Sequence, residues 1–124
     1  MKYSVNAKAC PDAPGAASKG TTAGRLVFAS AQLPVDENGH VVGKTIQDQA
    51  AVVLDHVESI LAEVGLDLSD VAKTTLYLKD LDDLEGFDEV YTERIDPPMP
   101  ARSVVCAHEL PFGAHVQMDA VACR

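Results

Sequence analysis

The chain has 124 residues, and its 10 lysines and arginines against 19 aspartates and glutamates give a formal charge of −9. This length fits one domain with a single core, which we expect to span residues 1–124, and the acidic balance excludes the basic surface with which proteins bind nucleic acid. There is no signal-peptide core, no apolar run of the roughly 18 residues that cross a membrane, and no CxxC pair, so we expect a cytoplasmic protein that binds no membrane.

The N-terminal half is predicted to contain a loop, two paired strands and a long helix. Residues 10–24 are small, carry Gly and Pro and lack periodicity, which is typical of a surface loop. The segments "RLVFASAQLP" and "VDENGHVV", with an Asn-Gly turn signal in the second, predict a strand pair. Apolar residues at three- and four-residue steps across residues 46–64, opened by Thr45 with Asp48 and closed by Gly65, predict a helix.

The C-terminal half is predicted to contain a strand, a second helix and two further strands. "VAKTTLYL" alternates loosely as a strand, and residues 84–95 carry an apolar stripe that predicts a shorter helix, which the following prolines end. Two strands are predicted near residues 101–108 and 114–122. The element order ββαβαββ predicts an α+β fold, a mixed sheet with two helices on one face.

Alternation sorts the side chains of the last two predicted strands into faces. Arg102 shares a face with Val104, and in the final strand Gln117 and Asp119 lie opposite a wholly apolar face. Because two helices cover only one side of a four- or five-stranded sheet, we expect the mixed face with Arg102, Gln117 and Asp119 to be left uncovered. Solvent or another subunit would then face it, and another subunit is the interpretation we favour.

Arg102 is the leading candidate for ligand binding. Three prolines, at 97, 98 and 100, stiffen the approach to it, and a guanidinium on a partly apolar face can bind a small carboxylate through two hydrogen bonds. The alternative is a structural salt bridge across a subunit contact to one of the many acidic residues.

Other polar residues are weaker candidates for chemistry. Gln117 could orient a water molecule and Asp119 could accept a proton, although such residues are often merely solvated. Cys106 and His108 share a strand face, but the orienting group and oxyanion donor of a nucleophilic site are not identifiable. The histidines lack metal-ligand spacing, the acidic run "KDLDDLEGFDE" lacks the spacing of a calcium loop, and no phosphate-binding motif occurs. We therefore expect neither a metal nor a cofactor.

Four segments together resemble one known family. "LVFASAQLPVDENG", "DVAKTTLYLKDLDDLEGFDEVY", "PARSVV" and "LPFGAHVQMDAVA" follow the order found in the RidA/YjgF family of reactive-intermediate deaminases, and the resemblance runs over residues 14–122. It implies a chorismate-mutase-like α+β fold that assembles as a homotrimer with three clefts at the subunit interfaces. A neighbouring subunit would then cover the mixed sheet face.

The resemblance also implies an activity and roles for particular residues. In active members of the family, the arginine of "PARS", here Arg102, holds the carboxylate of a 2-imino or 2-enamine acid, and water hydrolyses this acid to a 2-keto acid and ammonia. The serine of a "SGQ" motif, here Ser30, begins a strand segment that shapes the pocket. The glutamate credited with handling the water falls on Gln117, which keeps a polar group but removes the proton acceptor.

The chain departs from the family pattern at further pocket positions. The glycine of "SGQ" is Ala31, a tyrosine falls on Ala17, an asparagine on Asp88 and a cysteine on Val104. Asp88 would compete for Arg102 if the two were within reach. Because a protonated imine is already electrophilic, hydrolysis remains compatible with Gln117. The alternative is a non-catalytic or differently specialised homologue that binds a small carboxylate. The endoribonuclease activity of some relatives is disfavoured by the acidic charge.

Overall fold

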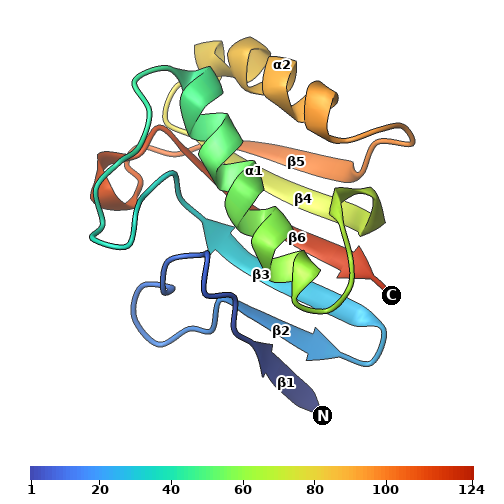
Figure 1. Ribbon diagram of the computed structural model, residues 1–124. Helices are drawn as coiled ribbons and strands as arrows, with labels where there is room; N and C mark the ends of the chain where they lie inside the picture. The colour runs from blue at the N-terminus through green and yellow to red at the C-terminus, as the bar shows by residue number, and fades with distance from the viewer.

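The computed structural model describes Met1–Arg124 and contains a six-stranded sheet with two helices across one of its faces (Figure 1). The elements are β1 (Lys2–Val5), β2 (Gly20–Ala23), β3 (Leu26–Gln32), α1 (Ile46–Ala62), β4 (Val71–Leu78), α2 (Leu84–Arg94), β5 (Ala101–Cys106) and β6 (Val116–Cys123). The sheet order is β1-β2-β3-β6-β4-β5, and β4 and β5 are parallel whereas the other neighbours are antiparallel. The predicted α+β class is confirmed.

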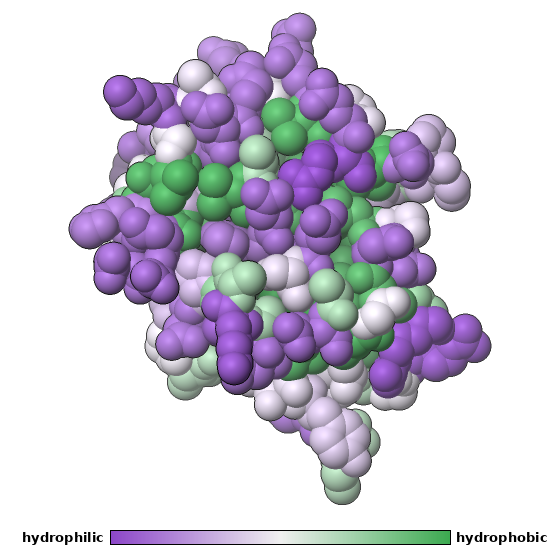
Figure 2. Space-filling view, in the orientation of Figure 1, coloured by the Kyte–Doolittle hydropathy of each residue, from purple (hydrophilic) through white to green (hydrophobic).

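The helices form where the apolar periodicity predicts them. Thr45 caps α1, accepting a hydrogen bond from the Asp48 backbone nitrogen at 3.1 Å, and Gly65 follows the helix with a φ of 75°. The apolar stripe of α1 and the side chains of Phe87 and Tyr91 in α2 are buried against the sheet, where they form the main core. Hydrophilic side chains cover most of the helix side of the molecule, with apolar patches between them (Figure 2). None of the helices is long and apolar enough to span a membrane.

The N-terminal strands differ from the prediction. Residues 10–24, expected to be a loop, contain β2, and β1 pairs with β2 at the edge of the sheet. The predicted second strand over "VDENGHVV" is reduced to an isolated bridge between Val35 and Val41. β1 and β2 are four residues long and largely lack apolar alternation. They are strands because β2 pairs with β3 and β1 pairs with β2.

The expected placement of Arg102 on the uncovered face is wrong. In the parallel pair of β4 and β5, Arg102 is in register with Thr74 and Val104 with Leu76, and both β4 residues are buried under the helices. Gln117 and Asp119 lie on the opposite, uncovered face, because Val116 and Met118 fill the core. A polar side chain is accommodated on the helix side because β5 is an edge strand that α2 covers incompletely.

Candidate functional site

Arg102 pairs with an acidic residue of its own chain. Nη1 of Arg102 donates to Oδ1 of Asp88, and Nη2 donates to Oδ2 at 3.1 Å, so the contact is bidentate. Asp88 lies on α2. The side chain of Arg102 remains 22% exposed and that of Asp88 34% exposed. The condition under which Asp88 was expected to compete for Arg102 is therefore met.

A buried tyrosine supports this ion pair. The Arg102 guanidinium carbon lies 5.0 Å from the centroid of the Tyr91 ring, within the range of a cation–π contact. The Tyr91 hydroxyl bonds the hydroxyl of Thr74 at 2.9 Å, and Thr74 is fully buried. Burial raises the pKa of Tyr91, which the Thr74 hydrogen bond partly offsets, so the ring is neutral at physiological pH. We call Thr74, Asp88, Tyr91 and Arg102 the arginine cluster.

One edge of the guanidinium remains available to a ligand. The hydrogen bond with Asp88 raises the pKa of Arg102 against the effect of burial, so the group is always protonated. Asp88 occupies the edge formed by Nη1 and Nη2, and Nε makes no hydrogen bond within the chain. Every buried side-chain nitrogen or oxygen has a partner, so Nε retains contact with solvent. Nε is therefore the nitrogen of Arg102 whose N–H is left for a second acceptor.

Ser30 and Ala31 form a β-bulge in β3. The pairing with β6 runs from Ala29 opposite Ala120 to Gln32 opposite Met118, so that Ser30 and Ala31 together oppose Asp119. The Ser30 backbone nitrogen donates to Lys19 at 2.9 Å, and its hydroxyl donates to the carbonyl of Ser18. Bulges re-aim side chains and are frequent beside active sites.

The bulge holds several predicted residues near one another. Ala17 is next to Ser18 in the loop that contacts Ser30, and it lines a shallow hollow there. Gln117 lies on β6 two residues before Asp119 and is half-buried, and its side chain makes no hydrogen bond within the chain. We call Ala17, Ser30, Ala31, Gln117 and Asp119 the bulge cluster.

Asp119 sits in a polar row across the uncovered face. Burial raises the pKa of Asp119, and Lys73 and Thr75 partly offset this effect. Lys73 lies on β4 and donates to the Ser103 hydroxyl at 3.0 Å. The row can hold water or a polar group of a neighbouring molecule.

The arginine cluster and the bulge cluster do not meet within one chain. Ser30 and Ala31 on β3 are three strand spacings, or about 14 Å, from β5, and Gln117 on β6 is two spacings, or about 10 Å, from it. Arg102 also points to the helix side, whereas Gln117 points to the uncovered side. Val104 is near Arg102 but packs partly against the core. The structure thus brings Arg102 together with Asp88, and Ser30 with Ala17 and Ala31, and keeps these groups apart.

Sequence reasoning missed the support that Tyr91 and Thr74 give to Arg102. Tyr91 fits the apolar stripe of α2, and Thr74 reads as an ordinary strand residue. A usable signal was the position of Asp88 three residues before Tyr91, which places both on the same side of α2.

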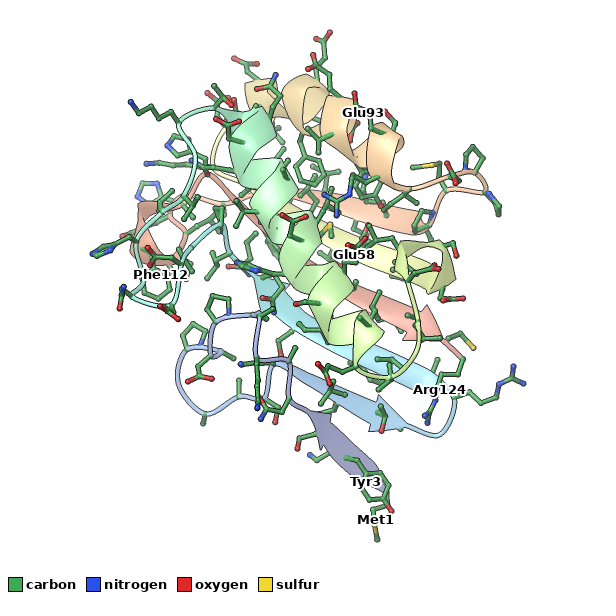
Figure 3. All side chains as sticks on the ribbon, viewed as in Figure 1. Met1, Tyr3, Glu58, Glu93, Phe112 and Arg124 are labelled. Carbon is green, nitrogen blue, oxygen red and sulfur yellow. The ribbon has the colours of Figure 1, made fainter.

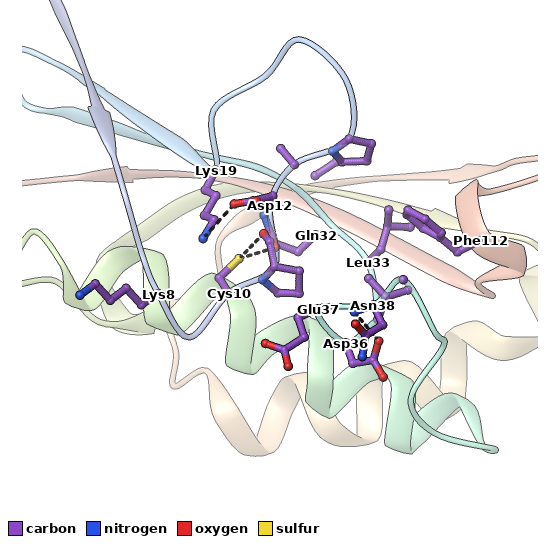
Figure 4. Close-up of a pocket in the computed structure, with 16 residues that line it drawn as sticks. Lys8, Cys10, Asp12, Lys19, Gln32, Leu33, Asp36, Glu37, Asn38 and Phe112 are labelled. Carbon is purple, nitrogen blue, oxygen red and sulfur yellow. Dashed lines mark hydrogen bonds and ion pairs between the residues drawn. The ribbon is translucent and has the colours of Figure 1, made fainter.

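A hollow of about 440 Å³ adjoins the bulge at Ala31 and lies between the N-terminal segment and the turn after β3 (Figure 4). The Cys10 thiol donates to Oε1 of Gln32 at 3.0 Å, and Lys19 lies 3.4 Å from an oxygen of Asp12. Burial raises the pKa of Cys10 to about 11. The thiol is therefore protonated at neutral pH and unreactive. Cys106, the cysteine considered with His108 as a nucleophilic pair, donates to the carbonyl oxygen of Lys79 and not to His108.

Comparisons with known proteins point to one family. Residues 7–124 match the family model described as endoribonuclease L-PSP. A RutC family protein of Pyrococcus abyssi is 38% identical over 109 residues, which is 87% of this chain and 86% of that protein. The chloroplastic Reactive Intermediate Deaminase A of Arabidopsis thaliana is 35% identical over 98% of this chain and 65% of its own length. The crystal structure of E. coli TdcF with bound serine matches with a TM-score of 0.90 and 31% identity, covering 98% of both chains.

Proposed function

Since the chain belongs to the RidA/YjgF family, we propose that it hydrolyses small 2-imino and 2-enamine acids to 2-keto acids and ammonia. Relatives named reactive intermediate deaminases support this activity, and the serine bound to E. coli TdcF supports a small amino-acid-like ligand. The observation that carries the proposal is Arg102 in "PARS", permanently charged and with its Nε edge open to solvent. The charge of −9 argues against RNA as the substrate.

We place the reaction at clefts between the subunits of a homotrimer. The arginine cluster and the bulge cluster are too far apart in one chain to hold the same small molecule, so a second protomer has to supply one of them. The uncovered face also leaves Phe28 and Val105 38% and 41% exposed beside its polar row. Burial of such apolar surface against another copy is favourable.

The residues divide the chemistry between binding and water placement. Arg102 holds the carboxylate, which fixes the orientation of the adjacent C=N bond. The amide oxygen of Gln117 accepts a hydrogen bond from the attacking water, whose oxygen bonds to C2 while its proton leaves to solvent. The amino group of the resulting carbinolamine takes up a proton from solvent, the C–N bond breaks to release ammonia, and loss of the hydroxyl proton to solvent leaves the 2-keto acid.

The test follows the decay of 2-iminobutanoate generated in situ, with and without the protein. We predict that the wild-type protein accelerates the decay and that Arg102→Ala returns it to the buffer rate, because the carboxylate loses its receptor. Glu93→Gln is the matched surface control, since Glu93 is an exposed residue of α2 without hydrogen bonds to other side chains (Figure 3). Equal rates with and without wild-type protein would overturn the proposal.

A second function is favoured by two observations. Gln117 cannot accept a proton as a glutamate does, and Asp88 already occupies one edge of Arg102. Both fit a homologue that binds small carboxylates without turning them over. In that case amino or keto acids would raise the melting temperature while the imine decay stays at the buffer rate.

A further inference from the structure

We propose that Asp88 is a specificity-determining residue, which makes the site prefer ligands that carry a cationic nitrogen beside their carboxylate over ligands that carry the carboxylate alone. This inference rests on the proposed function, because it takes Arg102 as the carboxylate receptor. It concerns which acid binds there and is separate from whether hydrolysis follows.

The ion pair with Asp88 occupies one edge of the Arg102 guanidinium. Asp88 uses two of the five N–H groups of Arg102, both on the edge formed by Nη1 and Nη2. Nε has no partner in the chain and keeps contact with solvent. A ligand carboxylate can therefore bind at the Nε edge while Asp88 stays in place. Tyr91 supports the guanidinium through its ring, which keeps its plane fixed during such binding.

The charges of Arg102 and Asp88 determine which ligands bind beside them. Arg102 and Asp88 together are neutral. The positive charge is delocalised over the guanidinium, and the negative charge lies on α2 beside it. A monoanion at the Nε edge is repelled by Asp88, which is bound at the adjacent edge of the same guanidinium. A ligand whose nitrogen is positive presents opposite charges to both residues. Asp88 is 34% exposed, so its carboxylate can be reached from the ligand side.

The substrate and the product of the proposed reaction differ in charge. A protonated 2-imino acid carries a carboxylate and a cationic nitrogen, whereas the 2-keto acid product carries only the carboxylate. Asp88 thus favours substrate over product and promotes product release. An asparagine at this position would leave Arg102 with a full positive charge and would bind both kinds of ligand more equally.

The experiment compares two ligands of nearly equal shape, 2-aminobutanoate and 2-oxobutanoate, by titration calorimetry or NMR chemical shifts. We expect wild-type protein to bind the amino acid more tightly, and Asp88→Asn to shift the ratio of the two Kd values at least about tenfold toward the keto acid. Glu93→Gln removes one negative charge from the same helix without touching Arg102, and we expect it to leave the ratio unchanged.

Each other outcome overturns the inference. A Kd ratio in Asp88→Asn equal to that of wild-type protein would show that Asp88 is only a structural partner. Should Asp88→Asn fail to fold, the wild-type titration still decides, because equal or tighter binding of 2-oxobutanoate contradicts the proposal, as does failure of both ligands to bind. A negative imine-decay assay is a separate result. A protein that does not hydrolyse the imine can still show the predicted ratio of Kd values.

Discussion

At the scale of single residues, the proposed chemistry depends on an arginine whose carboxylate partner is internal. Arg102 is held by Asp88 on one edge and by the Tyr91 ring on one face, so little side-chain freedom is lost when a ligand binds. Gln117 is separate from this cluster and carries the other half of the proposed mechanism. Gln117 lacks the proton acceptor that the resemblance to the family implies at this position.

Changing Gln117→Glu supplies that proton acceptor. We predict that the imine-decay rate rises by up to about 100-fold, the lower range of general acid–base contributions. Gln117→Leu keeps similar bulk without the polar group, and its rate should fall below that of the wild type. If the Glu variant is no faster than the wild type, proton transfer is not the limitation and Gln117 has another role.

Cys10 gives a residue-level prediction for pH. Its folded-state pKa is raised from 9.0 to about 11 by burial, so the folded protein retains the thiol proton more tightly than the unfolded chain. This contribution to stability is complete below pH 9 and is lost between pH 9 and 11, because the unfolded thiol ionises first. We expect the free energy of unfolding to fall by about 1 to 2 kcal/mol over this pH range. This is less than the full pKa difference would give, because nearby solvent screens the charge of the thiolate.

Denaturant unfolding at several pH values measures this loss. Cys10→Ala is the comparison, since it lacks the titrating group and should show a smaller decline across the same range. Equal declines in the two proteins would assign the pH effect to other residues.

At the scale of elements, the sequence predicted the helices and strands that have a long apolar pattern. It did not predict the short strands that form only by pairing with a neighbouring strand. α1, α2 and β4 follow from apolar periodicity over eight or more residues. β1 and β2 do not, because short, half-exposed strands carry little pattern of their own. Strand parity correctly grouped Arg102 with Val104, but it cannot say which face the helices cover at an edge strand. The arginine cluster was therefore only partly predictable.

The missed strand β2 has a packing constraint that can be tested. A Cβ atom at Gly20 would lie 2.8 Å from Cγ2 of Ile60 in α1 and 2.9 Å from the backbone oxygen of Phe28. We predict that Gly20→Ala lowers the free energy of unfolding by about 1 to 3 kcal/mol, the range for overpacking. Ser4→Ala, on the exposed strand beside it, should change it by less than about 0.5 kcal/mol. Similar stability of both variants would contradict this packing.

At the scale of the whole molecule, the distance between the two clusters is the reason for proposing an assembly. In the proposed assembly, a second copy of this 13.2 kDa chain would bring its bulge cluster to the arginine cluster, because Arg102 and Gln117 lie on opposite sides of one sheet. The polar row with Asp119 and Lys73 and the exposed side chain of Phe28 lie on the face that such a copy would cover.

We predict a trimer of about 40 kDa in solution, three times the chain mass, measured by light scattering after size-exclusion chromatography. Phe28→Asp places a charge on the uncovered face and should shift the protein to monomers. Leu81→Asp changes an exposed residue outside that face and should leave the trimer intact. A monomeric wild-type protein would remove the proposed intersubunit cleft.

The most direct test of the central claim is a crystal structure of the wild-type protein with 2-aminobutanoate. We predict that the ligand carboxylate accepts hydrogen bonds from the Nε edge of Arg102, with Asp88 still bound to the other edge and Ser30 of a neighbouring protomer close by. A carboxylate bound elsewhere, for example in the hollow beside Cys10, with Arg102 contacting only Asp88, would contradict it.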